Sequence, residues 1–109
     1  GLYSYKTDAY MIIPPKNMKD LFEEGRKLNH CVGSYSDRIV EGKSCIMFIR
    51  KTEEPDKPYF TIEINRSGNY VEQLRANSNR RINHSTEKEL VKFLKEWSKK
   101  KNVALNSAA

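Results

Sequence analysis

Hydrophobic residues gather in short blocks along the chain, and four of these blocks have the composition of β-strands. They are residues 9–13, 45–49, 59–65 and 70–74. In the third block, alternation places Phe60 and Ile62 on one face of the strand and Thr61 and Glu63 on the other. The second block is apolar throughout, which predicts a central strand covered on both faces. With a turn at residues 67–69, the last three blocks predict an antiparallel meander.

A helical spacing of apolar residues follows the two prolines at positions 14 and 15. Asn17 is placed to cap the helix, and its predicted buried face consists of Met18, Leu21, Phe22, Gly25 and Leu28. Charged residues between them, including Glu24, are assigned to the other side of this helix.

Two further helices are predicted later in the chain. Ser34 can cap a short helix that ends before Gly42, a residue suited to the left-handed conformation. Thr86 with Glu89 has the pattern of a capping box, and apolar residues from 90 to 97 mark an amphipathic helix after it.

The predicted order is therefore strand, two helices, three strands and helix. It favours an α+β fold, in which about three helices pack mainly on one face of a three- to four-stranded antiparallel sheet. A length of 109 residues suits one domain with one core. We interpret residues 1–109 as a single domain cut from a longer protein.

Charge and cysteine content bear on the possible binding partners and on the cellular location. The net charge of +6 permits binding to nucleic acid, although the run from Lys99 to Lys101 is first interpreted as a solvated helix end. Two cysteines, Cys31 and Cys45, are few for a secreted domain of this size, which favours a cytoplasmic location. The chain contains no apolar run long enough to predict a membrane span.

Several segments resemble one family. They are residues 28–35 (Leu-Asn-His-Cys-Val-Gly-Ser-Tyr), Gly42, residues 46–50, residues 58–64 with their Thr-x-Glu strand, and residues 72–75 with Gln-x-Arg. Together they resemble the PcfJ-like domain of bacteria, conjugative plasmids and phages. The resemblance implies a role linked to mobile elements, and it carries over no catalytic residue.

Cys31 is the strongest candidate for a nucleophile, because it precedes a predicted helix start that would favour a thiolate. A dyad with His84, or with the adjacent His30, and with Glu63 or Gln73 as an orienting group, would suit acyl transfer or hydrolysis. The favoured alternative is that Cys31 is a small buried hydrophobic residue. The histidines and cysteines lack the spacing of a metal site, so we expect no metal and no cofactor.

A second candidate is the polar face of the predicted meander. Thr61 and Glu63 share one side of their strand and would lie beside Glu72 or Gln73 and Arg75 of the next strand. Tyr35 and His30 would close a pocket over them. An ordinary cross-strand pair of Glu and Arg is the alternative, and the two interpretations remain open.

The third candidate is the polar segment 75–84, which contains Arg75, Asn77, Asn79, Arg80 and Arg81. Arginines bind phosphates and asparagine amides can contact base edges, so the segment suits nucleic acid. An exposed polar loop is the alternative.

The leading hypothesis is therefore a binding module that contacts nucleic acid or a protein partner, including other domains of its parent protein. The alternatives are a small enzyme that uses Cys31 and a purely structural module. The sequence predicts no oligomeric state.

Overall fold

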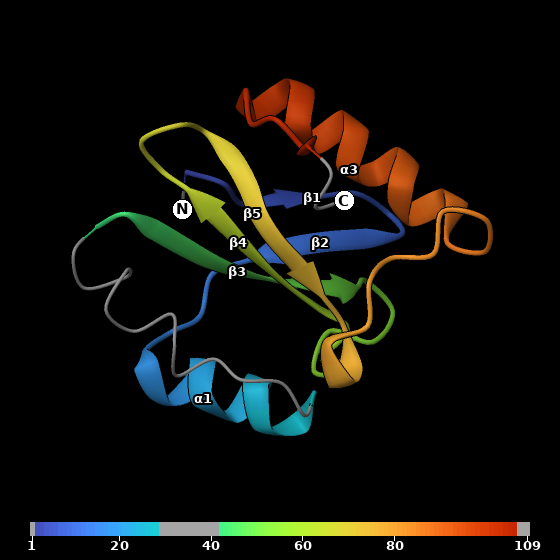
Figure 1. Cartoon of the computed structure of the whole chain (residues 1–109). Helices are drawn as coiled ribbons and strands as arrows, with labels where there is room; N and C mark the ends of the chain where they lie inside the picture. Colours follow the sequence, from blue (N-terminus) through green and yellow to red (C-terminus); the bar gives the residue numbers. More distant parts are fainter. Residues whose placement is uncertain (1, 29–41, 107–109) are drawn as a thin grey trace.

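A computed structural model describes residues 2–28 and 42–106 of the chain (Figure 1). The described elements are β1 (Tyr5–Lys6), β2 (Tyr10–Ile13), α1 (Met18–Lys27), β3 (Ser44–Lys51), β4 (Phe60–Asn65), β5 (Tyr70–Arg75), the short 3-10 helix η2 (Asn77–Asn79) and α3 (Lys88–Lys101). Each strand pairs antiparallel with the next, which gives one five-stranded sheet in the order β1-β2-β3-β4-β5. The predicted α+β class and the antiparallel meander are confirmed.

The strand that sequence analysis missed is β1, at the edge of the sheet. It pairs Tyr5 with Ile12 and Lys6 with Met11, and it is only two residues long. A strand of that length has no alternation to detect. α3 anchors the segment just before β1, because the indole Nε1 of Trp97 donates a 2.9 Å hydrogen bond to the carbonyl oxygen of Tyr3.

The two helices cover opposite faces of the sheet, which corrects the expectation that helices pack mainly on one face (Figure 1). Along β3, Ile46 and Phe48 pack with Leu21 of α1, whereas Met47 and Ile49 belong to the core beneath α3. Successive strand residues point to opposite faces, so an unbroken apolar strand needs a cover on each side. The predicted helix at 34–41 lies outside the described residues.

α1 begins as the sequence predicts. The side-chain oxygen of Asn17 accepts a 2.9 Å hydrogen bond from the backbone N–H of Asp20, and the Asp20 carboxylate accepts one of 3.0 Å from the N–H of Lys16. This reciprocal arrangement satisfies donors that the first helical turn leaves unpaired. Leu21 is 1% exposed and fixes the helix on the sheet, whereas Met18 and Phe22, which were predicted on the buried face, are 37% and 47% exposed.

Glu24 corrects the assignment made from helical spacing, because it is only 3% exposed and forms an ion pair with Arg50 of β3. The Nη2 of Arg50 donates to the Glu24 carboxylate at 2.7 Å, and Nη1 donates to the other carboxylate oxygen. Arg50 also donates through Nε to the carbonyl of Pro55 at 3.2 Å. The pair thus joins α1, β3 and the loop after β3.

α3 packs through Leu90, Phe93, Leu94 and Trp97, which are all buried. Its end was predicted from the basic last turn, and Asn102 adopts the left-handed conformation there, with φ 56°. Its start corrects the predicted capping box at Thr86.

The residue at the N-cap position of α3 is Glu87, and no side chain caps the helix. Instead, the side-chain oxygen of Asn83 accepts hydrogen bonds from the N–H groups of Ser85 and Thr86, at 2.9 and 3.1 Å. The chain therefore turns around Asn83 before α3 begins.

A bulge in β5 keeps the core continuous. Val71 and Leu74 both lie in the core under α3, although three positions separate them and an unbroken strand would point them to opposite faces. The register shifts between Glu63 and Ile64, which pair with Gln73 and Val71 and leave Glu72 as the extra residue.

Candidate functional site

The polar face predicted for the meander exists, and it lies on the side of the sheet that carries α1. Glu63 pairs with Gln73, and Thr61 pairs with Arg75, so these four side chains leave the same face of β4 and β5. The structure thus brings together three of the predicted site residues, namely Glu63, Gln73 and Arg75. The direct cross-strand partner of Glu63 is Gln73, whereas the alternative interpretation paired it with arginine.

Glu63 lies deep in this face. Glu63 is only 1% exposed, and the hydroxyl of the buried Ser44 donates a 2.7 Å hydrogen bond to its carboxylate. A buried carboxylate requires such polar contacts, because burial without them is costly. Glu63 is therefore part of the internal polar structure of the sheet.

The loop after β5 has a defined shape. The N–H of Ala76 donates to the carbonyl of Arg80 at 2.8 Å, and the N–H of Arg80 donates to the carbonyl of Asn77 at 3.1 Å. Between them Ser78 and Asn79 have positive φ values of 55° and 62°. Asparagine adopts this left-handed region more readily than most residues.

The same loop is attached to the end of α1. The N–H of Ser78 donates a 2.6 Å hydrogen bond to the carbonyl of Leu28. Asn77 and Asn79 remain exposed on either side of this attachment. The loop therefore presents two amide side chains from a backbone that is fixed at both ends.

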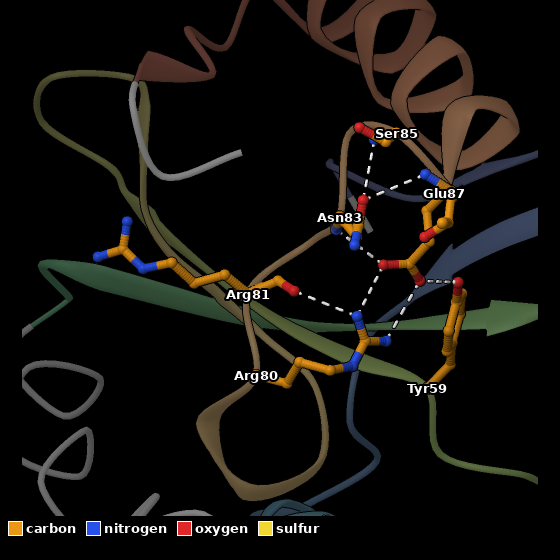
Figure 2. Close-up of polar contacts among 7 residues, drawn as sticks. Tyr59, Arg80, Arg81, Asn83, Ser85 and Glu87 are labelled. Atoms are coloured by element: carbon orange, nitrogen blue, oxygen red, sulfur yellow. Dashed lines mark hydrogen bonds and ion pairs between the residues drawn. The ribbon is translucent and has the colours of Figure 1, made fainter.

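Arg80 and Arg81 have different environments (Figure 2). The guanidinium of Arg80 contacts both carboxylate oxygens of Glu87, at 2.7 and 3.2 Å, and lies 5.3 Å from the centre of the Phe60 ring. The exposed side chain of Arg81 points away from Glu87 in Figure 2, and only its carbonyl oxygen accepts a bond from Arg80. Sequence alone gave the two arginines the same role.

Glu87 is the centre of a network that sequence analysis did not predict (Figure 2). Besides Arg80, its carboxylate accepts hydrogen bonds from the hydroxyl of Tyr59 at 2.5 Å and from the N–H of Asn83 at 2.9 Å. Burial acts to raise the pKa of Glu87, but the hydrogen bonds from Arg80, Tyr59 and Asn83 outweigh it and lower the pKa to about 2. Burial, followed by the bond to Glu87, raises the pKa of Tyr59. The four-residue spacing of Asn83 and Glu87 was the feature of the sequence that could have indicated this contact, because it brings the Glu87 carboxylate to the N–H of Asn83.

Replacing Glu87 by glutamine should make the acid sensitivity of the fold smaller. Because the folded pKa of about 2 lies below the ordinary value of 4.5, Glu87 stabilises the fold above pH 4.5 and loses this contribution as the pH falls toward 2. We expect Glu87→Gln to lower the free energy of unfolding at neutral pH by about 1–2 kcal/mol, a value reduced by the partial exposure of Arg80. Urea unfolding from neutral to acid pH measures this.

Glu89→Gln provides the control, since Glu89 is exposed in the first turn of the same helix. If Glu87→Gln and Glu89→Gln had the same stability at every pH, the network would contribute nothing.

The predicted catalytic residues are not assembled by the described part of the chain. His30, Cys31 and Tyr35 lie outside the described residues. His84 is exposed in the turn before α3, and α3 covers the face of the sheet opposite to Glu63 and Gln73. A catalytic set of Cys31 with His30 or His84 therefore stays a prediction.

Within residues 2–28 and 42–106, no three His, Cys, Asp or Glu side chains are grouped to hold a metal ion. Cys45 is half-buried, and burial raises the pKa of its thiol, which disfavours the reactive thiolate. Neither of the α-helices described here has the length and apolar content that a membrane crossing requires.

The net charge of the chain is concentrated in one contiguous segment. Residues 75–101, which run from the last residue of β5 to the end of α3, contain nine basic and three acidic residues, a net charge of +6. This equals the net charge of the entire chain, because the other 82 residues contain 11 basic and 11 acidic residues. The charge that composition reports is thus a property of one loop and one helix.

Comparisons with known proteins show which proteins this chain resembles. The profile described as PcfJ-like protein matches residues 2–91. An uncharacterized protein of Listeria innocua serovar 6a, Lin1253/Lin1744, is 37% identical over 82 residues. The match covers 73% of this chain and 18% of that protein, so the chain spans less than a fifth of the relative's length. No solved structure matches the chain.

Proposed function

The chain belongs to the PcfJ-like protein family, and we propose that it is a nucleic-acid-binding module of that family, acting in plasmid- or phage-related processes. The observation that carries the proposal is the concentration of the whole net charge of +6 in residues 75–101. The mobile-element setting rests on the family resemblance alone. Contacts with other domains of a longer parent protein are a further expectation.

Segregated positive charge is the property that distinguishes a nucleic-acid surface from a merely basic protein. Phosphates dominate nucleic-acid affinity, and each cation that neutralises one releases condensed counterions. The other 82 residues have no net charge, so the net charge that attracts a polyanion comes from this segment. Charges spread evenly over the surface would favour no such contact.

The loop after β5 supplies the groups for this contact. Arg81 is exposed and its guanidinium points away from the Glu87 network, so it is available to a phosphate (Figure 2). Asn77 and Asn79 are exposed amides, which can donate to and accept from base edges. Because hydrogen bonds already fix the loop backbone, binding requires little additional ordering.

The deeper predicted residues take a supporting role in this proposal. Glu63 is 1% exposed, and Gln73 and Arg75 are half-buried beside it. Arg75 donates to the carbonyl of Leu74 at 3.0 Å, at the point where β5 leads into the loop. These residues hold the end of the strand, and the exposed loop makes the contact.

Arg81→Ala and Asn77→Ala test the proposal, with a short labelled DNA duplex as the probe and fluorescence anisotropy as the readout. We expect Arg81→Ala to weaken binding about tenfold at low salt and to reduce the slope of log K against log salt by about 1. We expect Asn77→Ala to weaken binding without changing this slope, because it removes no charge. Arg80→Ala is unsuitable, since it also breaks the pair with Glu87.

Arg66→Ala is the matched control, because Arg66 is an exposed arginine in the turn between β4 and β5, at the opposite end of β5 from the loop. It removes the same charge from the part of the chain that is net neutral. Equal losses in Arg81→Ala and Arg66→Ala would exclude the loop as the contact, and a parent protein that binds no nucleic acid at low salt would exclude the function.

A further inference from the structure

We propose that the solvent face of α3 is a second contact surface, where four lysines bind the phosphates of a duplex backbone without reading its sequence. The lysine stripe consists of Lys88, Lys92, Lys95 and Lys99, which are all exposed. This inference rests on the proposed function and adds to it a ligand class and a second surface, separate from the loop at residues 76–81.

The spacing of the lysine stripe aligns its four charges. Steps of four, three and four residues keep them within about 60° of the helix circumference, over a length of about 17 Å. The buried residues of α3, Leu90, Phe93, Leu94 and Trp97, occupy the opposite side. The stripe therefore projects directly away from the core, and it lines a shallow hollow that also includes Val91 and Glu96.

The lysine stripe is not neutralised within the described structure. The ion pairs found between residues 2–28 and 42–106 join Arg50 to Glu24, Lys57 to Glu54 and Arg80 to Glu87, and none uses a lysine of the stripe. In total α3 contains six lysines and two glutamates. The net charge of α3 is therefore +4, compared with +6 for the entire chain.

The other helix shows what a merely solvated face looks like in this chain. Apart from the buried Glu24, α1 carries three basic residues and the acidic Asp20 and Glu23, so its solvent face has mixed signs. Mixed signs are sufficient for solubility. Like charges three and four residues apart destabilise a helix, and Glu96, which lines the same hollow, offsets only part of the repulsion among the four lysines. A polyanion lying along α3 removes that repulsion.

The chemistry of the lysine stripe selects the kind of nucleic acid. Single-stranded nucleic acid is bound by aromatic side chains on which bases stack. The aromatic residues of α3, Phe93 and Trp97, are buried and face the sheet. Lysines alone supply point charges for phosphates, which a duplex presents at high density and in a sequence-independent way. We therefore assign a duplex backbone to this surface.

A triple variant, Lys92→Gln with Lys95→Gln and Lys99→Gln, tests the assignment. Its control is Lys6→Gln with Lys19→Gln and Lys27→Gln, which removes three exposed lysines outside residues 75–101. Binding to a labelled DNA duplex is measured against salt concentration for both variants and the parent. We expect the stripe variant to reduce the slope of log K against log salt by about 2–3 and the control to reduce it by less than about 1.

Folding is monitored in the same samples by urea unfolding. The stripe variant should keep about the same urea midpoint as the parent, because relief of like-charge repulsion on α3 offsets the lost interactions with Glu89, Glu96 and the helix dipole. If the parent binds the duplex and both triple variants lose the same slope, the second surface is wrong while the proposed function stands. If the parent binds no duplex at all, both are wrong. A stripe variant that loses more binding to a single strand than to the duplex would overturn the assigned ligand.

Discussion

Replacing Arg50 by methionine should lower the free energy of unfolding by about 3–5 kcal/mol, because it leaves the Glu24 carboxylate buried without its partner. Only 8% of the Arg50 side chain and 4% of the Glu24 side chain are exposed. The guanidinium also loses its contact with the Pro55 carbonyl and its position 5.0 Å over the Phe48 ring. Urea unfolding followed by circular dichroism gives the free energy directly.

The double variant Glu24→Leu with Arg50→Met separates the charge from the packing. Buried ion pairs can often be replaced by apolar residues with little loss, so the double variant should recover much of the stability that Arg50→Met loses. A double variant less stable than either single variant would show that the pair stabilises the fold in its own right, contrary to this expectation.

Trp97→Ala should cost about 3–5 kcal/mol of unfolding free energy, since it opens a large cavity in the core under α3. Trp97 is fully buried, and its indole N–H is bound to the carbonyl of Tyr3. The substitution therefore loosens both α3 and the N-terminal segment that leads into β1. Thermal and urea unfolding measure the loss.

Trp97→Phe removes the hydrogen bond but leaves a much smaller cavity than alanine does. We expect it to cost about 1–3 kcal/mol, clearly less than alanine, because one buried carbonyl is left unpaired. Equal losses for the two variants would mean that the cavity contributes nothing and that the bond to Tyr3 explains the entire effect.

The sequence predicted the sheet better than it predicted the helices around it. The apolar strand at residues 45–49 was expected to be covered on both faces, and this feature alone requires cover from two sides. Placing the helices mainly on one face contradicted that expectation. A strand that is apolar on both faces needs a cover on each, and α1 and α3 supply one each.

Glu24 could not have been placed from helical spacing. Its partner, Arg50, lies 26 positions later, so the pair is formed by tertiary packing alone. Val71 and Leu74 are a different case, because their odd spacing in a strand was itself evidence of the bulge that the register shows.

Within the candidate site, residue type was predicted and residue role was not. Arg80 and Arg81 are adjacent and chemically identical, yet one is paired with Glu87 and the other points away from it. Thr86 and Glu89 have the spacing of a capping box. In the structure, the Asn83 side chain accepts hydrogen bonds from the N–H groups of Ser85 and Thr86, and the helix begins after this turn. Such choices depend on which neighbour the fold brings into reach, here Tyr59 of the β3–β4 connection.

The central claim is that residues 75–101, which carry the whole net charge, bind nucleic acid. Titrating the parent protein with a short labelled DNA duplex over a range of salt concentrations tests it most directly. We predict binding that weakens steeply as salt rises, with a slope of log K against log salt of at least about 3 in magnitude, because Arg81 and the lysine stripe each release counterions. No binding at low salt, or binding that does not depend on salt, would contradict the claim.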